Sequence, residues 1–139
     1  MYAQVGECFE QTIQLNIKSV SEFARLCGDF NPLHSDPVVA ARSRFQGLIA
    51  CGPQYASMFM GMAATHFAAK GLTLGLEFTF RFRVAVRSDD TLRFRWEVTA
   101  VTWNDKLAGD VVSLAGSITN AAGEEVLSST GKMLVSAPL

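Results

Sequence analysis

The chain has 139 residues, of which 49% are hydrophobic and 18% are charged, and its formal net charge is −1 at pH 7. A chain of this length can bury its own core, so we expect one domain over residues 1–139. The near-zero charge argues against a nucleic-acid-binding protein, and the apolar content argues against a disordered one.

The chain contains three widely spaced cysteines, Cys8, Cys27 and Cys51, and no Cys-x-x-Cys pair. This pattern predicts neither a disulfide framework nor a metal site. The first residues lack the basic start and apolar run of a signal peptide, so we expect a cytoplasmic protein.

Two short elements precede the motif that organises the chain. Apolar and polar residues alternate over residues 9–17, which predicts a first strand. Ser19 and Glu22 then have the spacing of a capping box, which predicts that a helix starts at Ser19. Gly28 stands where a helix C-terminal glycine is expected.

The middle of the chain predicts a second short helix and then a long apolar one. Asp36 is a good N-cap and Pro37 suits the first helical position. We expect the long helix to run from Pro53 to Ala69. Its apolar run is long enough to suggest a membrane span, but Gly52-Pro53 interrupts it and basic flanks are lacking, so we expect a buried helix and no membrane.

The second half predicts four strands, at residues 76–86, 92–98, 112–118 and 124–135, where apolar and polar residues alternate. Short turns separate them, among them Ser88-Asp89-Asp90, and indicate that all four are antiparallel neighbours in chain order. The expected architecture is α+β: an antiparallel curved sheet wrapped around a long central helix.

Residues 27–37 read Cys-Gly-Asp-Phe-Asn-Pro-Leu-His-Ser-Asp-Pro and predict a loop of fixed shape. A bend at Pro32 can turn Asp29 and His34 toward one point, and a carboxylate beside an imidazole is suited to proton transfer near neutral pH. Taken singly, each of these residues is also an ordinary turn residue.

This motif resembles that of the MaoC-like family, the (R)-specific enoyl-CoA hydratases (hydratase 2) and dehydratases of the hotdog fold. The family pattern Gly-Asp-x-Asn-Pro-hydrophobic-His-x-Asp is met without a gap from Gly28 to Asp36. The resemblance covers essentially the whole chain and implies a single hotdog domain.

The resemblance implies that Asp29 and His34 activate one water and exchange protons with a 2-enoyl thioester, by syn addition, to give an (R)-3-hydroxyacyl product. Asn31 is expected to support the loop, since an amide does not titrate in the useful range. The expected substrate is an acyl-CoA or acyl-carrier thioester, bound by a homodimer, and no metal or redox cofactor is needed.

The start of the long helix offers a site for negative charge on the thioester oxygen. Amides at a helix N-terminus carry partial positive charge, and Pro53 has no N–H, so we expect Gly52 to be the donor, with Cys51 as the alternative. The family carries His-Gly-Met where this chain has Cys51-Gly52-Pro53, so the glycine is kept and its neighbours differ.

Other polar residues have more ordinary explanations. We expect Cys51 to fill space as a small buried side chain, His66 to be structural and Asp36 to cap a helix. The arginines around the turn at residues 88–90 are expected mainly to solvate the outer faces of strands, with one or two left to meet carrier phosphates. They are Arg81, Arg83, Arg87, Arg93 and Arg95.

Two other functions remain open at this stage. A hotdog acyl-CoA thioesterase would direct water to the carbonyl carbon and release free acid. A non-catalytic acyl-thioester-binding subunit would hold the substrate unchanged, but it would be expected to have lost the acid or the imidazole, and this chain keeps both.

Overall fold

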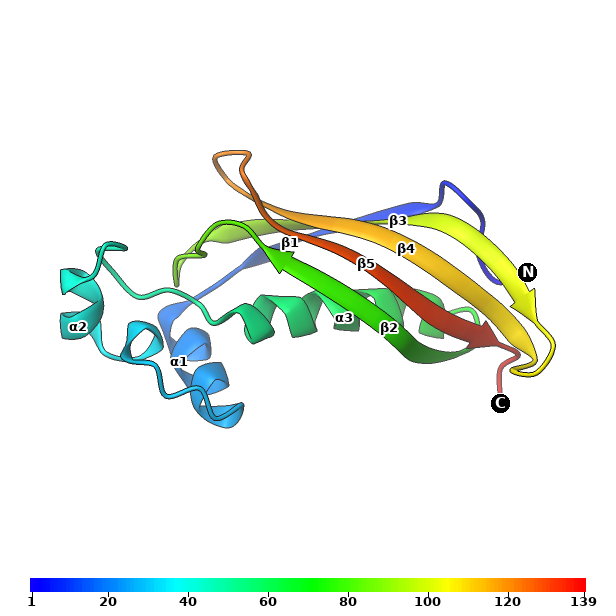
Figure 1. Cartoon of the computed structure of the whole chain (residues 1–139), viewed down its shortest axis with the longest axis horizontal. Helices are drawn as coiled ribbons and strands as arrows, with labels where there is room; N and C mark the ends of the chain where they lie inside the picture. The colour runs from blue at the N-terminus through cyan, green and yellow to red at the C-terminus, as the bar shows by residue number, and fades with distance from the viewer.

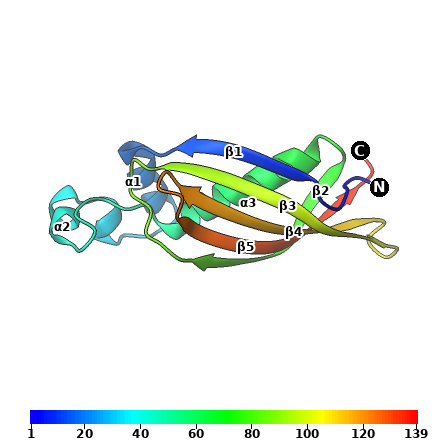
Figure 2. The same cartoon turned by 90° about the horizontal axis from the view of Figure 1, so that it is seen from above.

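The computed structural model describes residues 1–139 as five strands, three α-helices and a short 3-10 turn at Pro32–His34. The elements are β1 (Cys8–Gln14), α1 (Ile17–Leu26), α2 (Pro37–Arg42), α3 (Gly52–Ala68), β2 (Leu72–Phe82), β3 (Thr91–Asn104), β4 (Gly109–Asn120) and β5 (Glu125–Ser136). The strands form one antiparallel sheet of order β1-β3-β4-β5-β2, seen from above in Figure 2.

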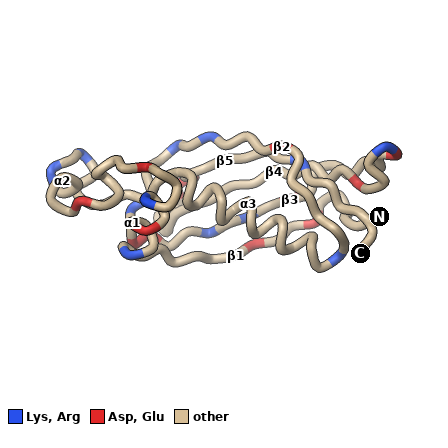
Figure 3. The backbone as a smooth tube through the Cα atoms, turned by 90° about the horizontal axis from the view of Figure 1, so that it is seen from below, with Lys and Arg blue, Asp and Glu red and all other residues tan.

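The sheet curves over α3, while α1 and α2 lie together beyond one end of it (Figure 1). Figure 3 shows that α3 carries no Lys, Arg, Asp or Glu along its length. The predicted long helix is therefore confirmed to within one residue at each end. None of the helices is both long and apolar enough to cross a membrane.

Helix α3 is joined to the sheet through aromatic packing at its middle. The fully buried rings of Phe59 on α3 and Trp96 on β3 stack with their centroids 3.9 Å apart. The indole N–H of Trp96 also donates to the backbone oxygen of Phe59, at 2.9 Å. Gly116 on β4 leaves room for this stack, since a Cβ there would lie 2.4 Å from Trp96 Cε3.

The prediction that the last four strands are consecutive neighbours is wrong for the first of them. Strand β2 pairs with β5, and β3 pairs with β1 and β4. A turn does form at Arg87 and Asp90, where the Asp90 carboxylate accepts from the Arg87 N–H at 2.9 Å. It precedes β3 as a corner and does not join two neighbouring strands.

The predicted bounds of β2 and α1 also need correction. Strand β2 spans Leu72–Phe82 and not residues 76–86, because its pairing with β5 begins at Leu72 and stops at Phe82. The N-cap of helix α1 lies three residues before Ser19, the predicted cap. Asn16 is the N-cap, since its side chain accepts from the Ser19 N–H at 2.9 Å, and Asn caps a helix at least as well as Ser.

A partly buried carboxylate just before β1 ties the start of this strand to the C-terminal end of α3. Glu7 accepts hydrogen bonds from His66 and from Lys70, the latter at 2.8 Å, and His66 stacks on Phe9. His66 thus lies in a structural cluster, as expected. Burial by itself would raise the pKa of Glu7, but the bonds from His66 and Lys70 outweigh it and lower the pKa to about 2.

We expect this cluster to make folding stability pH-dependent. A carboxyl group with a lowered pKa stabilises the fold fully above its ordinary value of 4.5 and loses that contribution as the pH falls toward 2. Urea unfolding at pH 6 and pH 3 should show that Glu7→Gln removes about 1–3 kcal/mol at pH 6 and much less at pH 3. An equal loss at both pH values would contradict a role for the charge.

Candidate active site

Asp29 and His34 meet at the end of the sheet where α1 and α2 lie. Oδ2 of Asp29 is 3.1 Å from Nε2 of His34, and the His34 side chain is 7% exposed while that of Asp29 is 35% exposed. The sequence therefore places these two side chains at one point, as the motif predicts. The pair thus consists of a buried imidazole in contact with a carboxylate that solvent can reach.

The loop that holds the pair is built from side-chain caps. The Asn31 N–H donates to Oδ1 of Asp29, and the Asn31 side chain accepts from the Leu33 N–H, each at 3.1 Å. Gly28 has a φ of 78°, which lets the chain leave α1 and enter the loop. Asp36 caps α2 as expected, accepting from the Val38 and Val39 N–H groups.

The second ring nitrogen of His34 sets the tautomer of the neutral ring. Nδ1 donates to the backbone oxygen of Ile49 at 2.8 Å, so Nδ1 carries a proton, because a carbonyl oxygen can only accept. In the neutral ring Nε2 therefore carries no proton, and it faces Oδ2 of the Asp29 carboxylate. An unprotonated ring nitrogen beside a carboxylate gives two neighbouring groups that can each accept or release a proton.

Gly52 begins α3 with a backbone N–H that donates no hydrogen bond within the protein. A side chain is excluded here, because a Cβ would lie 2.6 Å from Cε1 of Phe82. The residue that follows, Pro53, has no N–H to offer. The donor expected from the sequence is thus free and lies at the positive end of a 17-residue helix.

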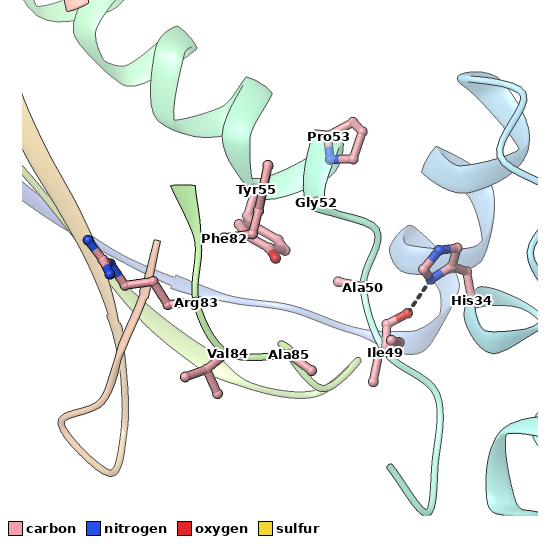
Figure 4. Close-up of a pocket in the computed structure, with 10 residues that line it drawn as sticks. All are labelled: His34, Ile49, Ala50, Gly52, Pro53, Tyr55, Phe82, Arg83, Val84 and Ala85. Atoms are coloured by element: carbon pink, nitrogen blue, oxygen red, sulfur yellow. Dashed lines mark hydrogen bonds between the residues drawn. The ribbon is translucent and has the colours of Figure 1, made fainter. Parts of the chain in front are cut away.

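A cavity of about 430 Å³ connects His34 with Gly52. Its walls come from the loop before α3, the first turn of α3 and the segment after β2 (Figure 4). The lining residues are His34, Ile49, Ala50, Gly52, Pro53, Tyr55, Phe82, Arg83, Val84 and Ala85. Six of the ten are hydrophobic, so an apolar group fits the cavity better than a charged one.

Cys51 lies next to this cavity but does not line it. It is buried at the N-cap of α3, and burial, the neighbouring Cys27 thiol and the Asp29 carboxylate raise the pKa of its thiol. A raised thiol pKa disfavours the thiolate that a nucleophile requires. The environment of Cys51 agrees with the expected packing role.

Most of the arginines considered from the sequence form ion pairs. Arg83 contacts Glu125 at 3.1 Å and, although it lines the cavity, points away from it in Figure 4. Arg93 contacts Glu10, as does Arg95. Arg81 and Arg87 have no carboxylate within 4.0 Å of their guanidinium groups, as for a cation that is free to meet a phosphate.

Sequence reasoning missed two aromatic residues of the cavity wall. Tyr55 and Phe82 meet edge to face with their centroids 5.9 Å apart. Phe82 reads in the sequence as one of several apolar residues of a strand, and Tyr55 as one of many on an apolar helix. A polar aromatic residue three positions after the predicted donor glycine was the one available signal.

The chain matches the family model of the MaoC like domain over residues 3–119 and therefore belongs to the MaoC-like dehydratase family. It is 32% identical over 136 residues to the (R)-specific enoyl-CoA hydratase of Aeromonas caviae, covering 97% of this chain and 96% of that relative. The expected family is thus confirmed.

Solved structures confirm the expected hotdog fold. The R-hydratase PhaJ1 of Pseudomonas aeruginosa, in its unliganded form, superposes with a TM-score of 0.87 at 27% identity, covering 97% of this chain and 83% of that one. The (R)-hydratase of A. caviae involved in PHA biosynthesis gives a TM-score of 0.85 at 28% identity over 98% of both chains. The sequence and structural comparisons together show that the chain belongs to a family of hydratases and dehydratases.

Proposed function

We propose that this protein is an (R)-specific 2-enoyl-CoA hydratase, which in reverse dehydrates 3-hydroxyacyl thioesters. The observation that carries the proposal is the Asp29–His34 contact beside an apolar cavity that also reaches the free Gly52 N–H. The (R)-specific hydratase of A. caviae, 32% identical, supports the same reaction.

The Asp29–His34 pair supplies the proton transfers of the reaction. One proton of a water passes to the pair as the water oxygen bonds to C3 of the substrate, and the pair returns one proton to C2. Each positioned acid or base contributes about 10²–10⁴ in rate. Because the two groups lie 3.1 Å apart, we assign the proton transfers to the pair and not to either residue alone.

The N-terminus of α3 supplies the electrostatic stabilisation of the reaction's transition state. As water adds to C3, the electrons of the double bond move toward C2 and the thioester oxygen, which becomes an enolate oxygen. The Gly52 N–H donates to that oxygen at the positive end of the helix. No metal or redox cofactor enters this sequence of bond changes, which balances with water alone.

The substrate we infer is an apolar acyl chain on a coenzyme A or acyl-carrier thioester. The lining of the cavity accounts for the apolar part. Arg87, whose guanidinium group contacts no carboxylate, lies beyond Val84 and Ala85 on the segment that forms the cavity wall and is suited to a carrier phosphate. Three free cysteines are suited to a reducing cytoplasm.

A homodimer paired along the β2 edge is part of the proposal. Strand β2 ends the sheet and exposes Leu72, Leu74 and Leu76, with Leu74 54% exposed. Exposed apolar side chains on an unpaired edge strand mark a surface for association. Light scattering should give about twice the chain mass of 15.1 kDa.

Three readouts with crotonyl-CoA and longer homologues separate this function from its rivals. A hydratase removes the enoyl-thioester absorbance and leaves the thioester intact, a thioesterase releases free thiol, and a binding subunit retains unchanged substrate. We expect loss of absorbance without thiol release. Release of thiol, or binding without reaction at every chain length, would overturn the proposal in favour of the corresponding rival.

A further inference from the structure

Tyr55 is a largely buried residue whose hydroxyl group has no partner in the protein. The residue is 4% exposed and lines the same cavity as His34 and Gly52. Its hydroxyl makes no hydrogen bond with any protein group, yet it is not sealed off from the cavity. The hydroxyl is open to the cavity and bonded to no protein group, so it is available to a ligand that enters there.

The position of Tyr55 on α3 directs this hydroxyl toward the start of the helix. Helical side chains lean toward the N-terminus and cover the residue three or four positions earlier, which for Tyr55 is Gly52 or Cys51. Gly52 has no side chain, so the ring of Phe82 lies directly against it, and Phe82 in turn meets the Tyr55 ring edge to face. Figure 4 shows the Tyr55 ring running from the first turn of α3 into the cavity.

Burial also keeps this group in the form that donates. Desolvation, with a smaller effect of the nearby Cys51 thiol, raises the pKa of Tyr55 to about 12. The phenol is therefore an O–H donor at every pH at which the protein is folded and active.

We propose that the Tyr55 O–H is a second hydrogen-bond donor to the thioester oxygen, acting with the Gly52 N–H. This inference rests on the proposed function. As the enolate forms, both groups donate to the same oxygen, and the phenolic proton stays on Tyr55 throughout. Two donors hold the oxygen in place as its charge grows, which a lone amide does less well.

Tyr55→Phe tests this donor while keeping the ring and its packing against Phe82. We expect kcat for hydration of crotonyl-CoA to fall by about 10²-fold, as for the loss of one such donor, with KM changed much less. Tyr2→Phe is the matched control, because Tyr2 is the second tyrosine of the chain and lies away from the cavity. The control should keep the wild-type rate.

A second measurement separates donation from packing. Fluorinated tyrosines placed at residue 55 lower the phenol pKa in steps with little change of shape. The rate constant should vary steadily with that pKa if the O–H donates to a developing charge. A Tyr55→Phe rate within about twofold of wild type, or a series without a trend, would overturn the proposal and leave the hydratase function standing.

A non-reacting ligand distinguishes failure of the donor from failure of the proposed function. Acetoacetyl-CoA forms an enolate that absorbs in the near ultraviolet, and an oxyanion site raises the enolate fraction. We expect wild-type protein to show this band and Tyr55→Phe to weaken it several-fold. If wild type hydrates nothing but shows a Tyr55-dependent band, the donor is supported and the hydratase function fails. If wild type shows neither activity nor band, both are overturned.

Discussion

Asp29→Asn is expected to lower kcat for enoyl-thioester hydration by at least about 10²-fold, and His34→Ala to do the same. The amide of Asn keeps the shape of the Asp29 side chain and can still accept from the Asn31 N–H. It cannot take a proton in the useful pH range. The loss should therefore appear in the rate and not in the stability of the fold.

The double variant and a matched control complete this test. When two residues act as one unit, replacing either one lowers the rate about as much as replacing both. The kcat of the double variant Asp29→Asn with His34→Ala should therefore lie within about tenfold of the kcat of either single variant. Asp36→Asn is the control in the same motif, because Asn caps a helix as well as Asp. A fully active Asp29→Asn would remove the acid–base pair from the mechanism.

Trp96→Ala is expected to reduce the free energy of unfolding by about 3–5 kcal/mol. The change leaves a cavity under α3, removes the stack on Phe59 and leaves the Phe59 carbonyl without its indole donor. Such a loss is a large part of the about 5–15 kcal/mol that holds a domain folded. Urea unfolding followed by circular dichroism measures it without relying on tryptophan fluorescence.

Trp103→Ala provides the control for this prediction. Trp103 also lies on β3, but it is 55% exposed and its indole N–H donates to the nearby Asp105 carboxylate. Its removal should cost about 1 kcal/mol or less. Equal effects of the two substitutions would mean that packing of α3 on the sheet does not dominate stability.

The sequence predicts the parts of this molecule that local chemistry decides. Asp36 and Pro37 start α2 because side-chain capping acts within three residues, and Gly28 ends α1 because the chain there needs a positive φ. The loop from Gly28 to Asp36 is held by bonds between near neighbours. The shape of the loop is therefore determined by its own residues.

The parts that sequence reasoning missed depend on partners far along the chain. A turn at residues 88–90 looks like a hairpin, but β5, nearly forty residues beyond it, competes successfully for β2. Residues 86–88 instead pair with residues 48–50, which turns the chain toward β3. The alternation of apolar and polar residues and the positions of turn residues show where a strand lies, but they do not show which strand pairs with it.

The candidate site divides in the same way. The Asp29–His34 contact is predictable from the motif that runs from Gly28 to Asp36, and the Gly52 donor from the start of a helix. The distance of Phe82 from Gly52, the bond from His34 to Ile49 and the unpartnered Tyr55 hydroxyl arise when segments far apart in sequence meet. Apart from the position of Tyr55 three residues after Gly52, the pattern of one segment carries no signal for them.

Hydration of a 2-enoyl thioester in heavy water tests most directly whether one acid–base pair performs both proton transfers. Because Asp29 and His34 lie together beside the cavity, the hydroxyl and the new C2 proton must enter from one face. We expect a product with one deuterium at C2, on the same face as the C3 hydroxyl, and the (R) configuration at C3. Addition from opposite faces, or an (S) product, would contradict the role of this pair.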